Sequence, residues 1–438
     1  MSDYVKFLRE TSPYINLHRG KIFVLAISGS GVRHPNFTNI VHDIALLHSL
    51  GVRLVVVHGA RPQVDDLMAE RGLSADFHDA TRITDAAGLA CVKQAVGLTR
   101  VDIEAKLSMN LANSPMHGAR IRISGGNFIT ARPLGVRDGV DFFHTGEVRR
   151  VDHDSILQHL NNGSLVLASP IGFSPTGEAF NLTYEEVATE IAVALKADKL
   201  LLFDDTDGIV DPDGALLRTI PLRDVPDWLT RLPADNSQWR SLVAAQRACM
   251  SGVNRVHLVT YACDDALLRE LFTRVGSGTL VLRDSAEVIR PATIDDVGGI
   301  LNLITPLEEQ GLLVKRSREL LEMEIHRFSV MVHSEGMIIA CAALYPFPDG
   351  EAGELACVAT HPDFHRQGLA SRLLENIEQQ ARSQGLERLF VLSTQTGHWF
   401  REKGFLDSSL DELPESKKSL YNYQRKSRIF VKSLIQSA

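Results

Sequence analysis

The segment ELACVATHPDFHRQGLASRLL, residues 354–374, decides the fold of the C-terminal part of the chain. It begins as a strand-like run, turns at Gly368, and continues with leucines at helical spacing. The start of a helix offers unpaired backbone N–H groups and a positive dipole, so it can bind phosphate without lysine side chains. Gly368 has no side chain that would keep a pyrophosphate away from the backbone. Taken alone, the segment fits a phosphate site and an ordinary strand-to-helix connection equally well.

The sequence on either side of this segment predicts a separate α+β domain. Thr293 and Asp296 have the spacing of a capping box at a helix start. Residues 328–345 contain two β-rich runs around a polar turn, which is typical of a hairpin, and residues 389–392 form a further strand. A hairpin followed by a strand, a crossover helix and another strand indicates one α+β unit.

The N-terminal two thirds of the chain alternate between short apolar runs and amphipathic helices. Residues 22–27 and 52–58 are nearly continuous apolar runs, as strands buried on both faces should be. Apolar residues recur at helical spacing between them, and a similar alternation returns in residues 165–203. We therefore predict an α/β domain with a mostly parallel sheet sandwiched by helices at residues 1–283, a linker at 284–290, and the α+β domain at 291–438.

The 438 residues have an ordinary globular composition, with 44% hydrophobic and 23% charged residues and a net charge of −8. The excess of 54 acidic over 46 basic side chains argues against nucleic acid as a partner, because binding to a phosphate backbone needs a basic face. No apolar run approaches the ~18 residues of a membrane helix and the N-terminus has no signal-peptide core, so we expect a cytoplasmic protein. The five cysteines are widely spaced and no CxxC or HExxH motif occurs, so we expect no metal site.

Residues 354–374 resemble the acetyl-coenzyme A loop of the GCN5-related N-acetyltransferases, whose pattern is Gln/Arg-x-x-Gly-x-Gly/Ala. His365 takes the first position here, which leaves the backbone cradle intact. In that family the last two strands splay apart, and the pantetheine arm fills the gap between them. The resemblance implies acetyl-CoA as cosubstrate, bound by the backbone of Cys357 and Val358 and by a loop of His365, Arg366, Gln367, Gly368, Leu369 and Ala370.

Transfer of an acetyl group to an amine requires an acid and a base. An α-amine with a pKa of about 8 is mostly protonated at pH 7, so a base must remove a proton and an acid must serve the departing thiolate. Glu354 is the best-placed carboxylate for the base, although its spacing fits an exposed strand-edge charge equally well. Ser393, just past the strand at residues 389–392, is the candidate acid, and Cys357 is expected to be a packing residue rather than a nucleophile.

The chain as a whole resembles the bacterial N-acetylglutamate synthases, which join an amino-acid-kinase-like domain to an acetyltransferase domain. The similar segments follow the same order, at residues 12–21, 47–63, 145–152, 176–189, 356–362, 398–400 and 413–427. The resemblance implies direct transfer of acetyl from acetyl-CoA to L-glutamate in a ternary complex, the first step of arginine biosynthesis, in a homo-hexamer. It places Arg316, Arg425 and Ser427 at the substrate carboxylates, whereas without it these residues fit exposed basic segments.

The kinase-like half lacks groups that phosphoryl transfer needs. That reaction depends on cations that neutralise developing charge. Related kinases have a Lys-x-Gly-Gly strand end, but residues 26–31 read AISGSG, and the Asn-x-Asn-x-Asp element of those kinases reads NLTYE at residues 181–185. The resemblance implies instead that this half binds L-arginine as a feedback inhibitor, beside a helix at residues 4–14, through Lys199, His257, Glu270, Gly276 and Gly278.

Two other functions stay open from the sequence. The first is a bifunctional enzyme that also phosphorylates acetylglutamate, and the missing lysine argues against it. The second is a non-catalytic arginine-sensing module whose acetyltransferase half only binds coenzyme A. The coexistence of Glu354, the cofactor loop and the pair Arg425 and Ser427 argues against the second.

Overall fold

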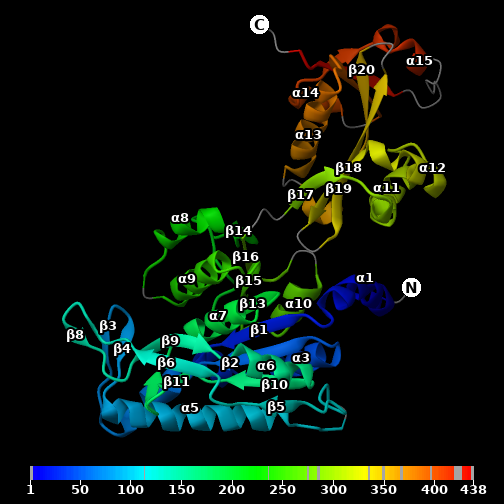
Figure 1. Ribbon diagram of the computed structural model, residues 1–438. Helices are drawn as coiled ribbons and strands as arrows, with labels where there is room; N and C mark the ends of the chain where they lie inside the picture. The colour runs from blue at the N-terminus through cyan, green and yellow to red at the C-terminus, as the bar shows by residue number, and fades with distance from the viewer. Residues whose placement is uncertain are drawn as a thin grey trace. The chain divides into compact units, whose positions relative to one another are not determined.

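The computed structural model describes residues 3–435 except 113, 235, 274–275, 284–286, 334–335, 348–350, 366–367, 395–396 and 419–426. The chain divides into two compact units, Met1–Asp284 and Ser285–Ala438 (Figure 1). Residues 287–290, which the sequence assigns to the linker, belong to strand β17 (Glu287–Pro291), because they pair in register with β18 (Phe328–His333). The predicted linker is therefore too long at its C-terminal side.

The N-terminal unit is built on an eight-stranded sheet with the order β14-β16-β15-β13-β1-β2-β10-β5. All its neighbouring strands are parallel except β15 and β16. Every residue of β1 and β13 is buried, which explains why these strands read as continuous apolar runs. The strands are β1 (Ile22–Ile27), β2 (Arg53–His58), β5 (Arg122–Ser124), β10 (Ser164–Ala168), β13 (Lys199–Asp204), β14 (Thr219–Pro221), β15 (Arg255–Thr260) and β16 (Thr279–Leu282).

Helices cover both faces of this sheet, as predicted. One core joins the sheet to α6, α7 and α9, and the other joins it to α3, α5 and α10, with Tyr14 of α1 at its edge. The helices are α1 (Asp3–His18), α2 (Gly29–Arg33), α3 (Phe37–Ser49), α4 (Arg61–Glu70), α5 (Ala86–Leu107), α6 (His153–Asn161), α7 (Tyr184–Ala194), α8 (Val225–Leu229), α9 (Ser237–Met250) and α10 (Ala266–Phe272). No helix in the described ranges is both long and apolar enough to cross a membrane.

Smaller sheets extend the N-terminal unit. A four-stranded sheet has the order β12-β11-β6-β9, and two short hairpins pair β3 with β4 and β7 with β8. These strands are only two to six residues long, so they carry little periodic signal in the sequence. They are β3 (Asp76–His78), β4 (Thr81–Ile83), β6 (Ile129–Pro133), β7 (Val136–Arg137), β8 (Val140–Asp141), β9 (Gly146–Val151), β11 (Ile171–Phe173) and β12 (Ala179–Asn181).

The C-terminal unit is a seven-stranded sheet with the order β17-β18-β19-β20-β21-β23-β22. Only β20 and β21 are parallel. Helix α13 packs on one face and α11 on the other. The remaining elements are β19 (Ile338–Phe347), β20 (Ala352–Thr360), β21 (Arg388–Ser393), β22 (Leu406–Ser408), β23 (Arg428–Ser433), α11 (Val297–Glu309), α12 (Arg318–Glu324), α13 (Leu369–Ser383), α14 (Gly397–Glu402) and α15 (Glu415–Lys418).

The predicted capping box at the start of this unit is confirmed. The Thr293 side chain accepts from the backbone of Asp296, and the Asp296 carboxylate accepts from the Thr293 N–H at 2.7 Å. The Arg290 guanidinium binds the same carboxylate with two hydrogen bonds, at 2.6 and 2.9 Å, and lowers the pKa of Asp296 to about 2. This pair of hydrogen bonds joins β17 to the turn before α11 and fixes where that helix begins.

Candidate functional site

Strands β20 and β21 separate after a short parallel contact. Beyond Glu354, β21 stays paired with β23 and β20 stays paired with β19. Among the described residues, no strand pairs with residues 355–360 on the side of β21. An extended ligand can enter such a fork and form hydrogen bonds with the open strand edge. The parallel pairing of β20 with β21 is limited to Ala352, Gly353 and Glu354 opposite Arg388, Leu389 and Phe390. The splayed strands implied by the resemblance are therefore confirmed.

A β-bulge lies on β20 beyond the start of the fork. The register with β19 shifts so that Cys357 and Val358 face one residue, Ala342. Cys357 has a φ of 52°, a left-handed conformation that turns the backbone out of the regular pleat. Burial raises the pKa of the Cys357 thiol to about 11, although the Arg316 guanidinium opposes the rise. A thiol that stays protonated near neutral pH is a poor nucleophile, which supports the packing role expected for it.

A cavity of about 600 Å³ lies in the fork. Its walls include residues 355–360, residues 391–394 and the first turn of α13. Gly368 is the N-cap of α13 with a φ of 75°, and its carbonyl oxygen accepts the N–H groups of Ser371 and Arg372. The N–H groups earlier in this turn have no partner within the helix, so they are available to an anionic ligand.

The predicted cofactor residues gather around this cavity. His365 is exposed, and its Nε2 lies 3.3 Å from the carbonyl oxygen of Thr360, so the loop turns back onto the end of β20. Arg366 and Gln367 lie outside the described residues. The other predicted residues all line the cavity, namely Cys357, Val358, His365, Gly368, Leu369 and Ala370.

The two predicted catalytic residues lie on the two strands of the fork. Glu354 is the last residue of β20 that pairs with β21, so it lies at the closed end. Its Oε2 accepts a hydrogen bond from Lys417 Nζ at 2.6 Å, and only 12% of the Glu354 side chain and 17% of the Lys417 side chain are exposed. Ser393 is the last residue of β21 and lines the cavity. The fold therefore places Ser393 further toward the open end than Glu354.

Sequence reasoning missed Lys417, the charged partner of Glu354. Lys417 lies in the one-turn helix α15, 63 residues after Glu354 along the chain. The adjacent Lys418 has the same chemistry but pairs with Glu415, whose side chain is 84% exposed. Because only the fold distinguishes these two lysines, no local pattern in the sequence indicates which of them matters.

We expect Lys417→Met to lower the free energy of unfolding by about 3 kcal/mol, because it leaves the largely covered Glu354 carboxylate without a counter-charge. Lys418→Met is the matched control and should change it by less than ~0.5 kcal/mol, since its partner is exposed. Urea unfolding of the full-length variants compares the two. Equal losses would contradict a special role for Lys417, and adding Glu354→Gln to Lys417→Met should recover most of the loss.

Arg316, predicted to bind the substrate, lies in the segment between α11 and α12. Its backbone N–H donates to Glu308 Oε1 at 3.0 Å, and its Nη1 donates to the carbonyl oxygen of Val314 at 3.2 Å. Burial lowers the pKa of Arg316, but the neighbouring Cys357 and Tyr345 side chains outweigh burial and raise that pKa. The two hydrogen bonds hold Arg316 in the segment that follows α11, beside Glu308 and Val314.

The other two predicted substrate residues belong to the segment before β23. Ser427 directly precedes β23, whose first residue, Arg428, pairs with Ser393. Ser427 therefore lies next to the end of β21, close to the open end of the fork. Arg425 lies outside the described residues.

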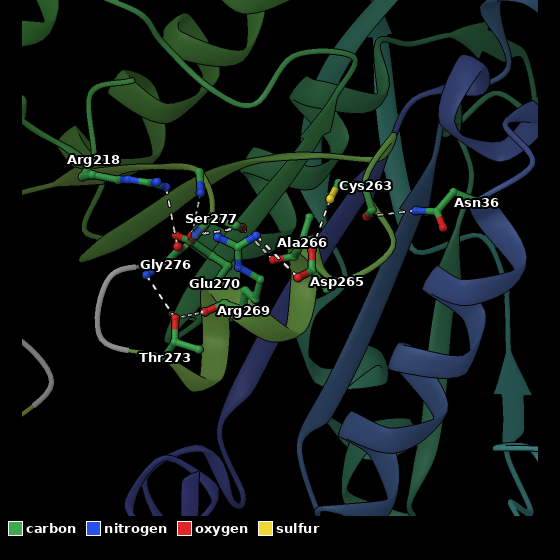
Figure 2. Close-up of polar contacts among 11 residues, drawn as sticks. Asn36, Arg218, Cys263, Asp265, Ala266, Arg269, Glu270, Thr273, Gly276 and Ser277 are labelled. Atoms are coloured by element: carbon green, nitrogen blue, oxygen red, sulfur yellow. Dashed lines mark hydrogen bonds and ion pairs between the residues drawn. The ribbon is translucent and has the colours of Figure 1, made fainter. Parts of the chain in front are cut away.

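The predicted effector residues surround α10 in the N-terminal unit. Glu270 accepts hydrogen bonds from His257 Nδ1 at 2.6 Å and from the N–H groups of Ser277 and Gly278 at 2.7 and 2.9 Å. Figure 2 shows Glu270 directed toward the loop that carries Ser277. Burial raises the pKa of Glu270, but the His257 side chain and the two N–H groups outweigh burial and lower it to about 2. Glu270 is thus a buried carboxylate that stays ionised at neutral pH.

Two predicted glycines allow the loop to close over Glu270. Gly276 has a φ of 71°, and a Cβ there would lie 2.6 Å from Glu270 Oε2. A Cβ on Gly278 would lie 2.0 Å from the carbonyl oxygen of Leu258. The Gly276 N–H donates to Thr273 Oγ1 at 3.2 Å, which ties the loop to the end of α10 (Figure 2). Side chains at either position would therefore displace this loop.

Lys199 and His257 project from the same face of the sheet. Leu201 of β13 lies opposite His257, and Lys199 precedes Leu201 by two residues. The Lys199 Nζ lies 5.9 Å from the centre of the Phe23 ring, against which His18 of α1 also packs. His18 further joins α1 to α10, because its Nε2 lies 2.8 Å from the carbonyl oxygen of Leu271. The sequence predicted the neighbouring helix but not His18.

A second cavity, of about 480 Å³, lies at the carboxyl ends of β1, β2 and β13. Ligands commonly bind in this position in parallel α/β sheets. At the end of β1 its lining residues are Ser28, Gly29 and Ser30, and the cations among all its lining residues are arginines, not lysines. Arg240 lies 3.6 Å from Glu185, which replaces the aspartate of related kinases, so this cation is already paired. This cavity therefore lies where the related kinases have their crevice, but its described lining residues do not include the lysine of those kinases.

Two protein-family models match the chain and define its class. The amino acid kinase family model matches residues 21–258, and the acetyltransferase (GNAT) family model matches residues 299–405. The fold class predicted from the sequence is therefore confirmed. Together with the forked sheet and its cavity, these matches define a GNAT acetyltransferase that carries a kinase-like domain.

Relatives of this class cover the whole chain. The amino-acid acetyltransferase of Ectopseudomonas mendocina is 57% identical over 434 residues, which is 99% of this chain and 100% of the relative. That of Pseudomonas fluorescens SBW25 is 58% identical over the same shares. The chain belongs to the amino-acid acetyltransferase family, and it is an enzyme of the acyltransferase class.

Solved structures point the same way. N-acetylglutamate synthase from Neisseria gonorrhoeae, complexed with coenzyme A and L-arginine, is 37% identical, with a TM-score of 0.87 and coverage of 99% of this chain and 100% of that chain. The same enzyme complexed with coenzyme A and N-acetyl-glutamate is 38% identical over the same shares, with a TM-score of 0.64.

Proposed function

We propose that this enzyme transfers the acetyl group of acetyl-CoA to the α-amine of L-glutamate, giving N-acetyl-L-glutamate and coenzyme A. The observation that carries the proposal is the separation of β20 from β21 after Glu354, with the bulge and the α13 N-terminus beside the same cavity. The N. gonorrhoeae synthase, complexed with coenzyme A and N-acetyl-glutamate, supports the choice of ligands.

The residues of the fork suit an acetyl-CoA molecule. The open edge at residues 355–360 offers backbone groups to the extended pantetheine arm, and the first turn of α13 offers N–H groups to the pyrophosphate. Gly368, without a side chain, admits the phosphate to the backbone. Acetyl-CoA supplies the activated acetyl thioester. Backbone N–H groups at Cys357 and Val358 would stabilise the oxyanion that forms when the thioester carbonyl is attacked.

The side chains supply the proton transfers. Glu354 would accept the proton of the substrate ammonium, directly or through a water, so that the neutral amine attacks the thioester carbon. The attack forms the C–N bond and a tetrahedral oxyanion, whose collapse breaks the C–S bond, and Ser393 would donate a hydrogen bond or proton to the departing thiolate. Transfer is direct, because the buried, protonated Cys357 thiol is unsuited to carry the acetyl group.

The acceptor carries two carboxylates, which arginine and hydroxyl donors bind well. We assign them to Arg316, Arg425 and Ser427. The position of Ser427 next to the end of β21 supports this assignment.

One assay tests the main proposal. Purified protein is mixed with acetyl-CoA and glutamate, and the release of free thiol is followed with and without arginine. We expect thiol release that depends on glutamate and exceeds the release with glutamine. If the folded protein releases no thiol with glutamate, the proposal fails, and a non-catalytic arginine-binding module becomes the better explanation.

The N-terminal unit is assigned to feedback inhibition by L-arginine through Lys199, His257, Glu270, Gly276 and Gly278. The buried carboxylate of Glu270 can pair with a guanidinium, and the N. gonorrhoeae synthase with bound L-arginine supports the ligand. Phosphorylation of acetylglutamate is not expected, because no lysine lines the crevice at the end of β1. The family resemblance alone supports the homo-hexamer and the cytoplasmic location included in this proposal.

A further inference from the structure

Lys417 places a primary amine directly on the proposed catalytic base. Its Nζ donates a hydrogen bond to Glu354 Oε2 at 2.6 Å, and only 17% of the Lys417 side chain is exposed. In the proposed reaction the substrate ammonium must come within hydrogen-bond reach of the same carboxylate, directly or through a water. Lys417 therefore already has the relation to Glu354 that an acceptor amine needs.

The fold holds Lys417 in this position. Its backbone N–H donates to the carbonyl oxygen of Pro414 at 2.9 Å, and the neighbouring Leu413, 3% exposed, belongs to a small core with Phe390 of β21. The Lys417 Nζ also lies 6.0 Å from the centre of the Phe347 ring. An amine that is fixed beside the reacting groups needs no binding step, so it reacts as if it were present at a very high concentration.

The acetyl thioester is assigned to the same strand as the base. Residues 355–360 of β20 form the open edge proposed for the pantetheine arm, and Leu355, the residue after Glu354, lines the cavity of the fork. In the proposed reaction Glu354 serves an amine that attacks this thioester. A lysine amine bonded to Glu354 is therefore also positioned to attack it when no other amine occupies the acceptor site.

We propose that the enzyme acetylates itself on Lys417 when acetyl-CoA is bound and the acceptor site holds no glutamate. The inference rests on two parts of the proposed function, namely acetyl-CoA in the fork and Glu354 as the base. The Lys417 Nζ gives a proton to Glu354 and attacks the thioester carbon, which forms an N–C bond and a tetrahedral oxyanion. Collapse of this oxyanion breaks the C–S bond and gives Nζ-acetyl-lysine and coenzyme A. Of the two protons that Nζ loses, one protonates the thiolate and the other passes to solvent.

Two comparisons make the proposal specific. Lys418 follows Lys417 in the chain, but its Nζ pairs at 2.7 Å with Glu415, an exposed carboxylate that is not the proposed base. A lysine ammonium holds its proton more tightly than an α-ammonium does, so self-acetylation should be much slower than the turnover of glutamate. Glutamate uses the same base, so it should suppress self-acetylation by competition.

The test follows the full-length protein in deuterium-labelled acetyl-CoA, so that new acetyl groups differ in mass from any acquired during expression. Without glutamate, peptide mapping by mass spectrometry should show Lys417 acetylated at least ~10 times faster than Lys418, because Lys417 is bonded to the base. Saturating glutamate should slow the labelling of Lys417 by about 10-fold or more. Glu354→Gln should slow it by about 10²-fold and leave the labelling of Lys418 unchanged. Lys417→Arg keeps a cation at this position and should remove the label.

The outcomes separate this inference from the proposed function. Equal labelling of Lys417 and Lys418 overturns the inference, and so does full-rate labelling of Lys417 in Glu354→Gln, because both results indicate an uncatalysed reaction with acetyl-CoA. Thiol release with glutamate, measured on the same preparation, tests the proposed function. If glutamate is acetylated and Lys417 is not, only the self-acetylation is wrong. If Lys417 is acetylated and glutamate is not, the assigned acceptor is wrong and the self-acetylation stands. If neither amine is acetylated, both proposals fail.

Discussion

Glu354→Gln is expected to lower kcat by about 10²–10⁴ while binding of coenzyme A stays nearly unchanged. The amide cannot take the proton of the substrate ammonium, but it keeps the size of the carboxylate and can still accept a hydrogen bond from Lys417. The cavity walls do not include residue 354, so the cofactor should lose no contact. Steady-state thiol release gives kcat, and calorimetric titration with coenzyme A gives the affinity.

The matched control for this experiment is Glu415→Gln, which removes an exposed carboxylate close to Lys417 in the sequence. It should leave kcat within about twofold of the wild type. Turnover of Glu354→Gln near the wild-type level would show that another group or solvent removes the proton. A loss of coenzyme A affinity in the same variant would show that Glu354 shapes the fork rather than acting as the base.

Glu270→Gln is expected to raise the arginine concentration needed for half-maximal inhibition by about 10²–10³-fold, because the substitution removes the buried charge that would face the guanidinium. A carboxylate has about four acceptor positions, and His257, Ser277 and Gly278 take three of them with short hydrogen bonds. Counting the described donors alone, the remaining position is on Oε1, so a bound guanidinium would use it or displace one of these donors. Inhibition curves of the acetyl-transfer reaction measure the change.

Acetyl transfer without arginine should be retained in Glu270→Gln, which distinguishes a lost effector site from a misfolded chain. Asp265→Asn is the matched control, because Asp265 lies at the start of the same helix and its side chain is 57% exposed. Arginine should inhibit this control as it inhibits the wild type. If Glu270→Gln kept its sensitivity to arginine, the effector site would have to lie elsewhere in the chain.

Much of the fold follows from local sequence patterns. Strands β1 and β13 are recognisable because burial on both faces demands continuous apolar residues, and the capping box at Thr293 needs only two residues three positions apart. The antiparallel pairing of β16 with β15, one strand in from the edge of the sheet, depends on contacts between distant segments, so no local pattern predicts it. The short strands of the four-stranded sheet could not be predicted from the sequence for a similar reason, since packing rather than periodicity defines them.

The residues of the candidate site also differ in whether a local sequence pattern could reveal them. The cofactor loop could be found because its glycine and the following helix are neighbours in the sequence. Lys417 was missed because its importance comes from its contact with Glu354, which only the folded chain brings about. The residues near Glu270 were assigned by resemblance, because a histidine and a glutamate 13 positions apart carry no signal of their own until the sheet and α10 bring them together.

The fork between β20 and β21 also bears on whether a strand of another chain can add to this sheet. An unpaired strand edge is a template on which a strand from another chain can add, and proteins usually blunt or cover such edges. Here the open edge lies inside a sheet and faces β21, which pairs with the same strand up to Glu354. A strand from another chain would have to enter between β20 and β21, which converge at this pairing. The convergence of the two strands, which shapes the cavity for a narrow ligand, thus also limits the space for strand addition at this edge.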